Sequence, residues 1–319
     1  MNVTRLLAVT TLVLFASPLA AVCLSATADG LLIGNVELRP GVFTDIHVTL
    51  MGDPDREDCQ VTIHGGPYTA ETWRPYAEAL GPASCVLAID LPGHGLSSVP
   101  TGIVYGELLL DDYVTTVIAV LDALESIDIE PRTIIGHSLG GTVVQMTQQR
   151  LIDAGTNLED AYDISEAILV APDYPAEVTW AFVDSGAAGP IIQSFIVADP
   201  VLGNIMQISA DVWPAFFFTN LAGEVVPGSP TPAEIVARGY VAPGEPELAI
   251  AQLLGLPPFT ARPSIDAGIF NEDEDTRLRV IAYENDGFIL LSETPGLYTH
   301  LTLDDSLECF IGVYGDDTT

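Results

Sequence analysis

Short apolar runs that alternate with helical patterns constrain the fold of this chain more than any other feature of its sequence. The runs are apolar on both faces of a strand, and the segments between them place apolar residues at helical spacing. A parallel sheet with helices on both faces buries strands of this kind, so we predict an α/β fold. The expected strands are 42–50, 61–64, 86–90, 133–135, 167–170 and 278–283, and the expected helices are 108–126 and 142–154.

The alternation stops after residue 172 and resumes at about 271. The stretch between is apolar but rich in Pro and Gly, and it shows no clear strand–helix alternation. A long irregular segment inside a regular domain is typical of a functional insertion. We therefore expect a core at 29–172, an inserted cap at 173–270 and the rest of the core at 271–319.

The first residues are typical of an export signal. Arg5 precedes an apolar run that ends at Leu24, and Ala26-Thr27-Ala28 forms an A-x-A site. We predict a signal peptide at 1–28, cleaved after Ala28, and hence a secreted or extracytoplasmic protein. The alternative is an uncleaved membrane anchor, since the run is long enough to span a bilayer.

The balance of charge excludes some partners. The 319 residues include 44 Asp and Glu but only 10 basic residues, all of them Arg, which gives a net charge of −34. Such a chain repels phosphate backbones and anionic lipid, so we expect neither nucleic acid nor an anionic membrane surface as a partner. The composition is typical of salt-adapted proteins and equally of acidic secreted proteins from GC-rich genomes, and the sequence leaves both open.

Two cysteines begin expected strands. Cys59 and Cys85 each stand five residues before the polar residue that ends the run, His64 and Asp90. If these strands are parallel neighbours, the two sulfurs start side by side and can form a disulfide in an oxidising compartment. Otherwise they are two buried thiols.

Three short motifs carry the chemistry. Gly136-His137-Ser138-Leu139-Gly140 follows an expected strand and leads into an expected helix. A serine on such a turn projects its hydroxyl outward, and the amide of Leu139 lies where an oxyanion develops. The second motif, His64-Gly65-Gly66-Pro67, would supply a further oxyanion donor from the N–H of Gly66. The third, residues 90–98, indicates only a turn by itself.

The order HGGP, DLPGHGLSS, GHSLGG and a late strand ending in Glu-Asn-Asp-Gly resembles the α/β-hydrolase superfamily over nearly all of the mature chain. This resemblance implies a mostly parallel eight-stranded sheet covered by helices on both faces, with a cap inserted after the sixth strand. It places the strands of HGGP and DLPGHGLSS side by side, which supports the pairing of Cys59 with Cys85. It also implies that Ser138 is the nucleophile, Asp286 the acid and His300 the base of a triad.

The chain departs from the family pattern near its end. Only 13 residues separate Asp286 from His300, which is about the minimum for a crossover between parallel strands. Either the crossover is shortened or the triad is broken. Asp173, just after the sixth strand, is an alternative acid in some relatives.

With an intact triad we expect a secreted serine hydrolase that cleaves a carboxylic ester or related acyl bond of a small molecule through an acyl-enzyme on Ser138. This chemistry requires no metal and no organic cofactor. An esterase or lipase ranks first. HGGP also occurs in relatives that release N-terminal proline, so an aminopeptidase stays open, and a broken triad would leave a catalytically inactive binding protein.

Overall fold

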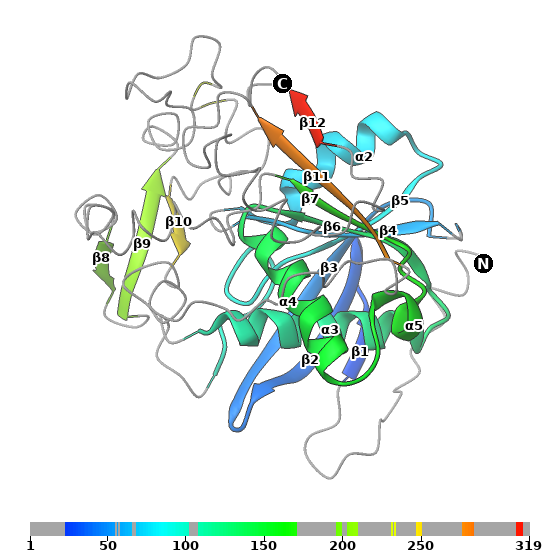
Figure 1. Ribbon diagram of the computed structural model, residues 1–319. Helices are drawn as coiled ribbons and strands as arrows, with labels where there is room; N and C mark the ends of the chain where they lie inside the picture. Colours follow the sequence, from blue (N-terminus) through cyan, green and yellow to red (C-terminus); the bar gives the residue numbers. More distant parts are fainter. Residues whose placement is uncertain are drawn as a thin grey trace.

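The fold is built around one nine-stranded sheet, in the order β1-β2-β3-β5-β4-β6-β7-β11-β12 (Figure 1). The computed structural model describes residues 23–54, 56, 58–65, 68–101, 108–170, 196–199, 203–209, 231, 233, 247–250, 276–283 and 311–314. In this sheet β5, β4, β6, β7, β11 and β12 each run parallel to the next, whereas β1, β2, β3 and β5 pair antiparallel in that order. The strands are β1 Cys23–Ala26, β2 Gly30–Arg39, β3 Val42–Gly52, β4 Cys59–Ile63, β5 Cys85–Ile89, β6 Pro131–His137, β7 Glu166–Val170, β11 Arg277–Tyr283 and β12 Ile311–Tyr314.

Helices cover both faces of this sheet. Alternate residues of β5 enter different clusters, since Leu87 packs with α3 (Leu110–Glu125) and α4 (Leu139–Asp153). Ala88 instead packs with η1 (Ala70–Trp73) and α2 (Arg74–Leu80) on the opposite face. A further short helix, α5, spans Leu158–Tyr162. Among the described residues, no helix is long and apolar enough to cross a membrane.

The expected α/β architecture is confirmed. Each strand and helix predicted from the hydrophobic pattern is present, with ends shifted by a few residues. Seven of the eight strands that the resemblance implied are β2 to β7 and β11, and the structure adds β1 at the edge. The expected position of the eighth strand was wrong: a crossover between Asp286 and His300 would place it before His300, whereas the next strand parallel to β11 is β12, which begins at Ile311. This ninth strand, Cys23–Ala26, lies inside the segment 1–28 assigned to a signal peptide, and cleavage after Ala28 remains a prediction.

A second, three-stranded antiparallel sheet falls within the expected insertion. It consists of β8 (Ile196–Asp199), β9 (Gly203–Ser209) and β10 (Glu247–Ile250), in the order β10-β9-β8. These strands come after β7 and before β11 in the chain (Figure 1). The rest of 173–270 lies almost wholly outside the described residues, so the boundaries of the cap stay a prediction.

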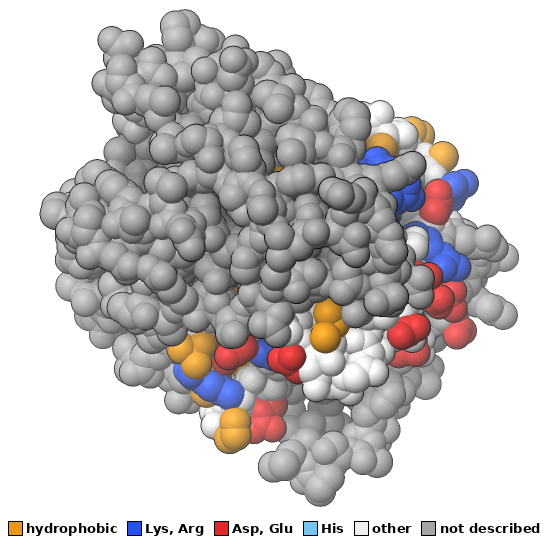
Figure 2. Space-filling view, in the orientation of Figure 1, with side chains coloured by type: hydrophobic (Ala, Val, Ile, Leu, Met, Phe, Trp, Pro, Cys, Tyr) orange, Lys and Arg blue, Asp and Glu red, His pale blue; other side chains and the backbone are white. Residues whose placement is uncertain are grey.

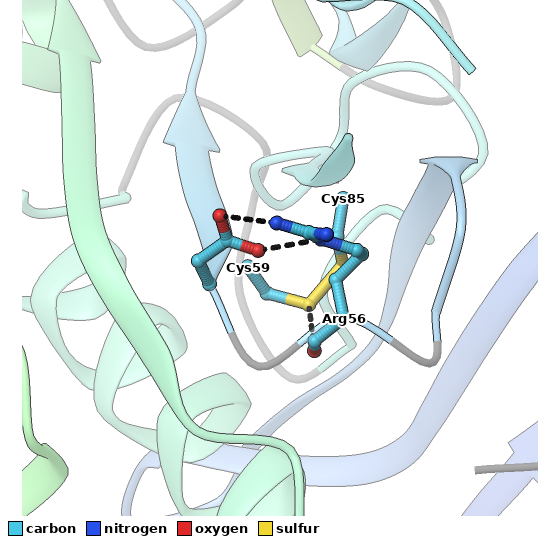
Figure 3. Close-up of a disulfide and its surroundings, with 4 residues drawn as sticks. Arg56, Cys59 and Cys85 are labelled. Carbon is cyan, nitrogen blue, oxygen red and sulfur yellow. Dashed lines mark hydrogen bonds and ion pairs between the residues drawn. A yellow bond between two sulfur atoms is a disulfide. The ribbon is translucent and has the colours of Figure 1, made fainter. Parts of the chain in front are cut away.

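The predicted disulfide is present. Cys59 and Cys85 begin the parallel neighbours β4 and β5, and a disulfide joins them across a Cα–Cα distance of 4.6 Å. Figure 3 shows the bond beside Arg56, whose guanidinium binds Asp58 through two hydrogen bonds of 2.8 Å. The bond holds together the amino ends of the two strands that lead into the motifs at 64–67 and 90–98.

Arginines on the described surface are neutralised locally. Every arginine whose side chain the structure describes forms an ion pair with a carboxylate, as for Arg150 with Asp111 at 2.7 Å. Blue and red side chains accordingly lie next to one another along the described part of the face in Figure 2. The acidic excess therefore remains after the basic side chains have been paired.

Candidate active site

Ser138 stands on a strained turn between β6 and α4. Its backbone has φ 50° and ψ −118°, whereas Asp163, another non-glycine residue with positive φ, has the ordinary left-handed values of 57° and 24°. A non-glycine residue in this region costs about 1–3 kcal/mol, and it persists only where its surroundings fix it. The Ser138 N–H donates to the Val170 carbonyl at 2.9 Å, and its carbonyl accepts from the Gly141 N–H at 2.8 Å.

The two glycines that flank the serine are required by close backbone contacts. A Cβ on Gly136 would lie 2.3 Å from the Gly140 carbonyl oxygen, and one on Gly140 would lie 2.4 Å from the Ile63 carbonyl oxygen. The helix therefore crosses the ends of β6 and β4 too closely for any side chain. These two close approaches explain why glycine stands on both sides of the serine in the G-x-S-x-G motif.

The loop after β4 lies directly against the serine. A Cβ on Gly65 would stand 2.9 Å from the Nδ1 of His137 and 3.1 Å from the Cβ of Ser138. Leu139, the first residue of α4, follows the serine, and the first N–H groups of a helix have no acceptor within it. The structure thus places Gly65 and Leu139 beside Ser138, while Gly66 lies outside the described residues.

His64 holds this loop in place. Its Nδ1 donates to the Gly65 carbonyl at 2.6 Å, and its Nε2 accepts from the Leu91 N–H at 3.0 Å. Because an N–H can only donate, the proton of the neutral ring belongs on Nδ1. Burial, reinforced by the ring of His94 at 4.9 Å, holds the pKa of His64 well below its usual value. The ring therefore joins the HGGP motif at 64–67 to the motif at 90–98.

Asp90 organises the third motif. Its Oδ1 accepts from the Ala70 N–H at 2.7 Å, and its Oδ2 accepts from the Leu96 N–H at 3.0 Å. Burial raises the pKa of the carboxyl group, although the two hydrogen bonds oppose that rise. Gly95, with φ 51°, is required because a Cβ there would lie 2.1 Å from Asp90 Oδ1. Sequence reasoning took this segment as a turn and missed the carboxylate that fixes it.

His137 differs from the other histidines. Burial lowers its pKa to about 4, and its Nδ1 has no hydrogen-bond partner among the described residues. The edge of the Tyr68 ring packs against it, with ring centroids 5.2 Å apart. The ring is therefore neutral near pH 7, beside the candidate nucleophile.

Several predicted site residues lie outside the described residues: Gly66, Asp173, Asp286 and His300. Their roles, and that of the Leu139 amide, stay predictions. Within the part of the chain that the structure describes, no three His, Cys, Asp or Glu side chains come together as metal ligands.

Comparison with known proteins gives both a family and a set of relatives. The model of a family described as the alpha/beta hydrolase family matches residues 60–297. A 2-hydroxy-6-oxo-2,4-heptadienoate hydrolase from Pseudomonas putida is 32% identical over 114 residues, which cover 35% of this chain and 37% of that protein. An (E)-2-((N-methylformamido)methylene)succinate hydrolase from Acinetobacter baylyi is 28% identical over 110 residues, 34% of this chain and 39% of the relative. The chain thus spans about two fifths of the length of these curated relatives.

A solved structure extends the likeness to most of the chain. The 2-hydroxy-6-oxo-6-phenylhexa-2,4-dienoate hydrolase of a Rhodococcus strain superposes with a TM-score of 0.52 at 20% identity. The superposition covers 85% of this chain and 87% of that one. At this identity the likeness shows a shared fold.

Proposed function

This chain belongs to the alpha/beta hydrolase family, and we propose that it is a secreted serine hydrolase that cleaves a carboxylic ester, or a related acyl bond, of a small molecule. The observation that carries the proposal is the backbone of Ser138, which is held at φ 50° and ψ −118° between a strand and a helix. In the proposed mechanism this turn presents the Ser138 hydroxyl to the substrate, and strained backbone of this kind clusters at active sites.

The surroundings of the serine fit acyl transfer. The start of α4 offers N–H groups, together with the positive end of a helix dipole, to an oxygen that becomes negative. Gly65 allows the loop after β4 to approach from the other side, where the Gly66 amide would be the second donor. The proposal thus gives the oxyanion two backbone donors, from Gly66 and Leu139.

The proposed mechanism needs a base from beyond the described residues. His300 takes the proton of the Ser138 hydroxyl as the oxygen attacks the carbonyl carbon, and Asp286 stabilises the imidazolium that forms. The leaving alcohol takes that proton, and a water molecule activated by the same histidine then hydrolyses the acyl-enzyme. Asp173 is the alternative partner of the histidine.

The names of the relatives bear on the kind of substrate. The two curated relatives are named as hydrolases of small organic acids. Their names support a small-molecule substrate for this chain as well. A serine, rather than an aspartate, at the elbow favours esters, lactones, thioesters and amides, including an N-terminal prolyl amide. Among these we rank a carboxylic ester first.

A fluorophosphonate probe tests the proposal. We expect the probe to label the wild type and to fail on Ser138→Ala and His300→Ala. Comparison of Asp286→Asn with Asp173→Asn then identifies the acid, since the variant that lacks it should react about 10⁴-fold more slowly. A folded wild-type protein that takes up no probe would overturn the proposal and favour a catalytically inactive binding protein.

A further inference from the structure

We propose that His137 is a specificity-determining residue whose ring donates a hydrogen bond from Nε2 to an uncharged oxygen in the acyl chain of the substrate, a keto or hydroxyl oxygen outside the scissile ester. This inference rests on the proposed function. It starts from a polar side chain that the catalytic mechanism leaves without a task.

His137 ends β6 and lies directly beside Ser138. Along β6, Ile134 belongs to the cluster under α3 and α4, and Ile135 belongs to the opposite cluster. The alternation of a strand places His137 on the same face as Ile135, at the last position before the serine. Its Nδ1 would lie 2.9 Å from a Cβ placed on Gly65, and the Cβ of Ser138 would lie 3.1 Å from the same position, so the two side chains lie next to the same glycine.

The chemistry of the ring then fixes which nitrogen can donate. With a pKa of about 4 the ring is neutral at pH 7, so only one nitrogen carries a proton. Nδ1 is buried and has no partner among the described residues. A buried N–H without an acceptor costs about 1–3 kcal/mol, and such groups are rarer than unpaired lone pairs. We therefore assign the proton to Nε2.

The exposure of the residue agrees with this assignment. His137 as a whole is only partly buried although its Nδ1 is fully buried, so its exposed part is not Nδ1. Tyr68 packs edge-on against the ring and fixes its plane. A donor that is fixed in this way discriminates by hydrogen bonding, because a ligand without an acceptor leaves the N–H unpaired.

The charge of the molecule selects among acceptors. A carboxylate would be the strongest acceptor for an N–H, but the net charge of −34 opposes the approach of an anion. The neutral ring offers no compensating positive charge. An uncharged oxygen is therefore the acceptor that suits the site.

Three p-nitrophenyl esters of matched chain length test the inference: the levulinate, which carries a keto oxygen, the valerate, which lacks it, and the hemiglutarate, which carries a carboxylate. The readout is the levulinate-to-valerate ratio of kcat/KM, because a ratio cancels any general loss of activity in a variant. We expect the ratio to fall by about 10-fold in His137→Phe, which keeps a ring but has no donor. His137→Gln, which keeps an N–H, should restore part of it.

The outcomes separate this inference from the proposed function. Equal ratios in the wild type and His137→Phe would overturn the role of His137 while fluorophosphonate labelling of the wild type still upheld the hydrolase. Preference for the hemiglutarate would overturn the uncharged acceptor. Absence of labelling in the wild type would overturn the proposed function and this inference with it.

Discussion

Gly65 shows how one missing side chain determines how closely a loop can approach the turn at Ser138. The space that its Cβ would fill is already bounded by the Nδ1 of His137 and the Cβ of Ser138. The loop that should bear an oxyanion donor can therefore approach the nucleophile only with glycine at this position. His64 then fixes the Gly65 carbonyl and so holds the loop.

Replacing Gly65 by alanine should cost activity without unfolding the protein. The added methyl group would stand 2.9 Å from ring atoms of His137 and Tyr68 and 3.1 Å from the Cβ of Ser138, so the loop or the groups around Ser138 must shift. A displacement of about 1 Å in an active site costs about 100-fold in rate. The measurement is kcat/KM on a p-nitrophenyl ester, together with the thermal midpoint. Gly34→Ala is the matched control, because the nearest atoms there are 3.5 Å away. Equal activity in the two variants would contradict this account.

The buried ring of His64 predicts a pH dependence of stability. Its pKa in the folded protein lies well below the usual value of 6.5. Below pH 6.5, therefore, His64 binds a proton in the unfolded chain but not in the folded one. The free energy of unfolding is therefore unaffected by the titration of His64 above about pH 6.5, and it falls by up to about 1.4 kcal/mol per pH unit as the pH decreases below that value.

Urea unfolding of the wild type and His64→Gln between pH 7.5 and 5 measures this effect. Glutamine can donate and accept hydrogen bonds but does not titrate, so the wild type should lose stability faster than the variant as the pH falls. The carboxylates titrate equally in both proteins. Parallel stability profiles would show that His64 is not a buried neutral group.

At the scale of secondary structure, β4 and β5 form the frame of the site. Their carboxyl ends carry the motifs that meet through His64, and their amino ends are joined by the Cys59–Cys85 disulfide. Parallel strands so fixed at one end have less freedom to slide at the other. The disulfide thus acts on the fold, at the end of the strands away from the chemistry.

Removing the disulfide should therefore lower stability. The bond closes a loop between residues 26 positions apart, which is worth about 3 kcal/mol in the chain-entropy account. We expect the double variant Cys59→Ala/Cys85→Ala to lose about that much free energy of unfolding, and reduced wild type to lose a similar amount. Cys309→Ala is the control, since it removes a cysteine from the mature chain and leaves Cys59 and Cys85 in place. A double variant as stable as the wild type would refute the structural role.

The hydrophobic pattern predicted the buried parallel strands in the middle of the sheet well and missed β1, β2 and β12, which lie at or next to its edges. β5 is buried along its whole length, so its sequence is a continuous apolar run. β2 was missed because it is irregular: its pairing with β3 shifts register twice, and Asn35 has φ 60°. The irregularity breaks the alternation on which recognition from sequence depends.

The candidate site was predictable only where the chemistry is local. The turn at Ser138 was indicated by a pentapeptide together with the expected strand just before it and the expected helix just after it, all within adjacent residues. The hydrogen bonds from Ala70 and Leu96 to Asp90 join separate segments of the chain and leave no local pattern. The neutral state of His137 likewise depends on what packs over it.

At the scale of the whole molecule, electrostatic repulsion is the main unbalanced force. The net charge is −34, and the described arginines are already paired with carboxylates. The remaining acidic groups repel one another over distances that salt screens, about 10 Å at 0.1 M and 3 Å at 1 M. Stability should therefore depend on ionic strength, as the hypothesis of salt adaptation requires.

We expect the thermal midpoint to rise when NaCl is added, by about 2–4 °C for each kcal/mol of repulsion that is screened. NaBr at the same ionic strength is the control, because it screens charge equally but acts differently on apolar surface. A rise in both salts supports screening. A midpoint highest at low salt would rule out salt adaptation.

The most direct test of the central claim is the mass of the protein during turnover. Rapid mixing with a p-nitrophenyl ester, acid quenching and peptide mass spectrometry would reveal any acyl-enzyme. We predict one acyl group on the peptide that contains Ser138, accompanied by a stoichiometric burst of p-nitrophenol. Turnover that leaves Ser138 unmodified, with the acyl group on another residue or on none, would contradict the account.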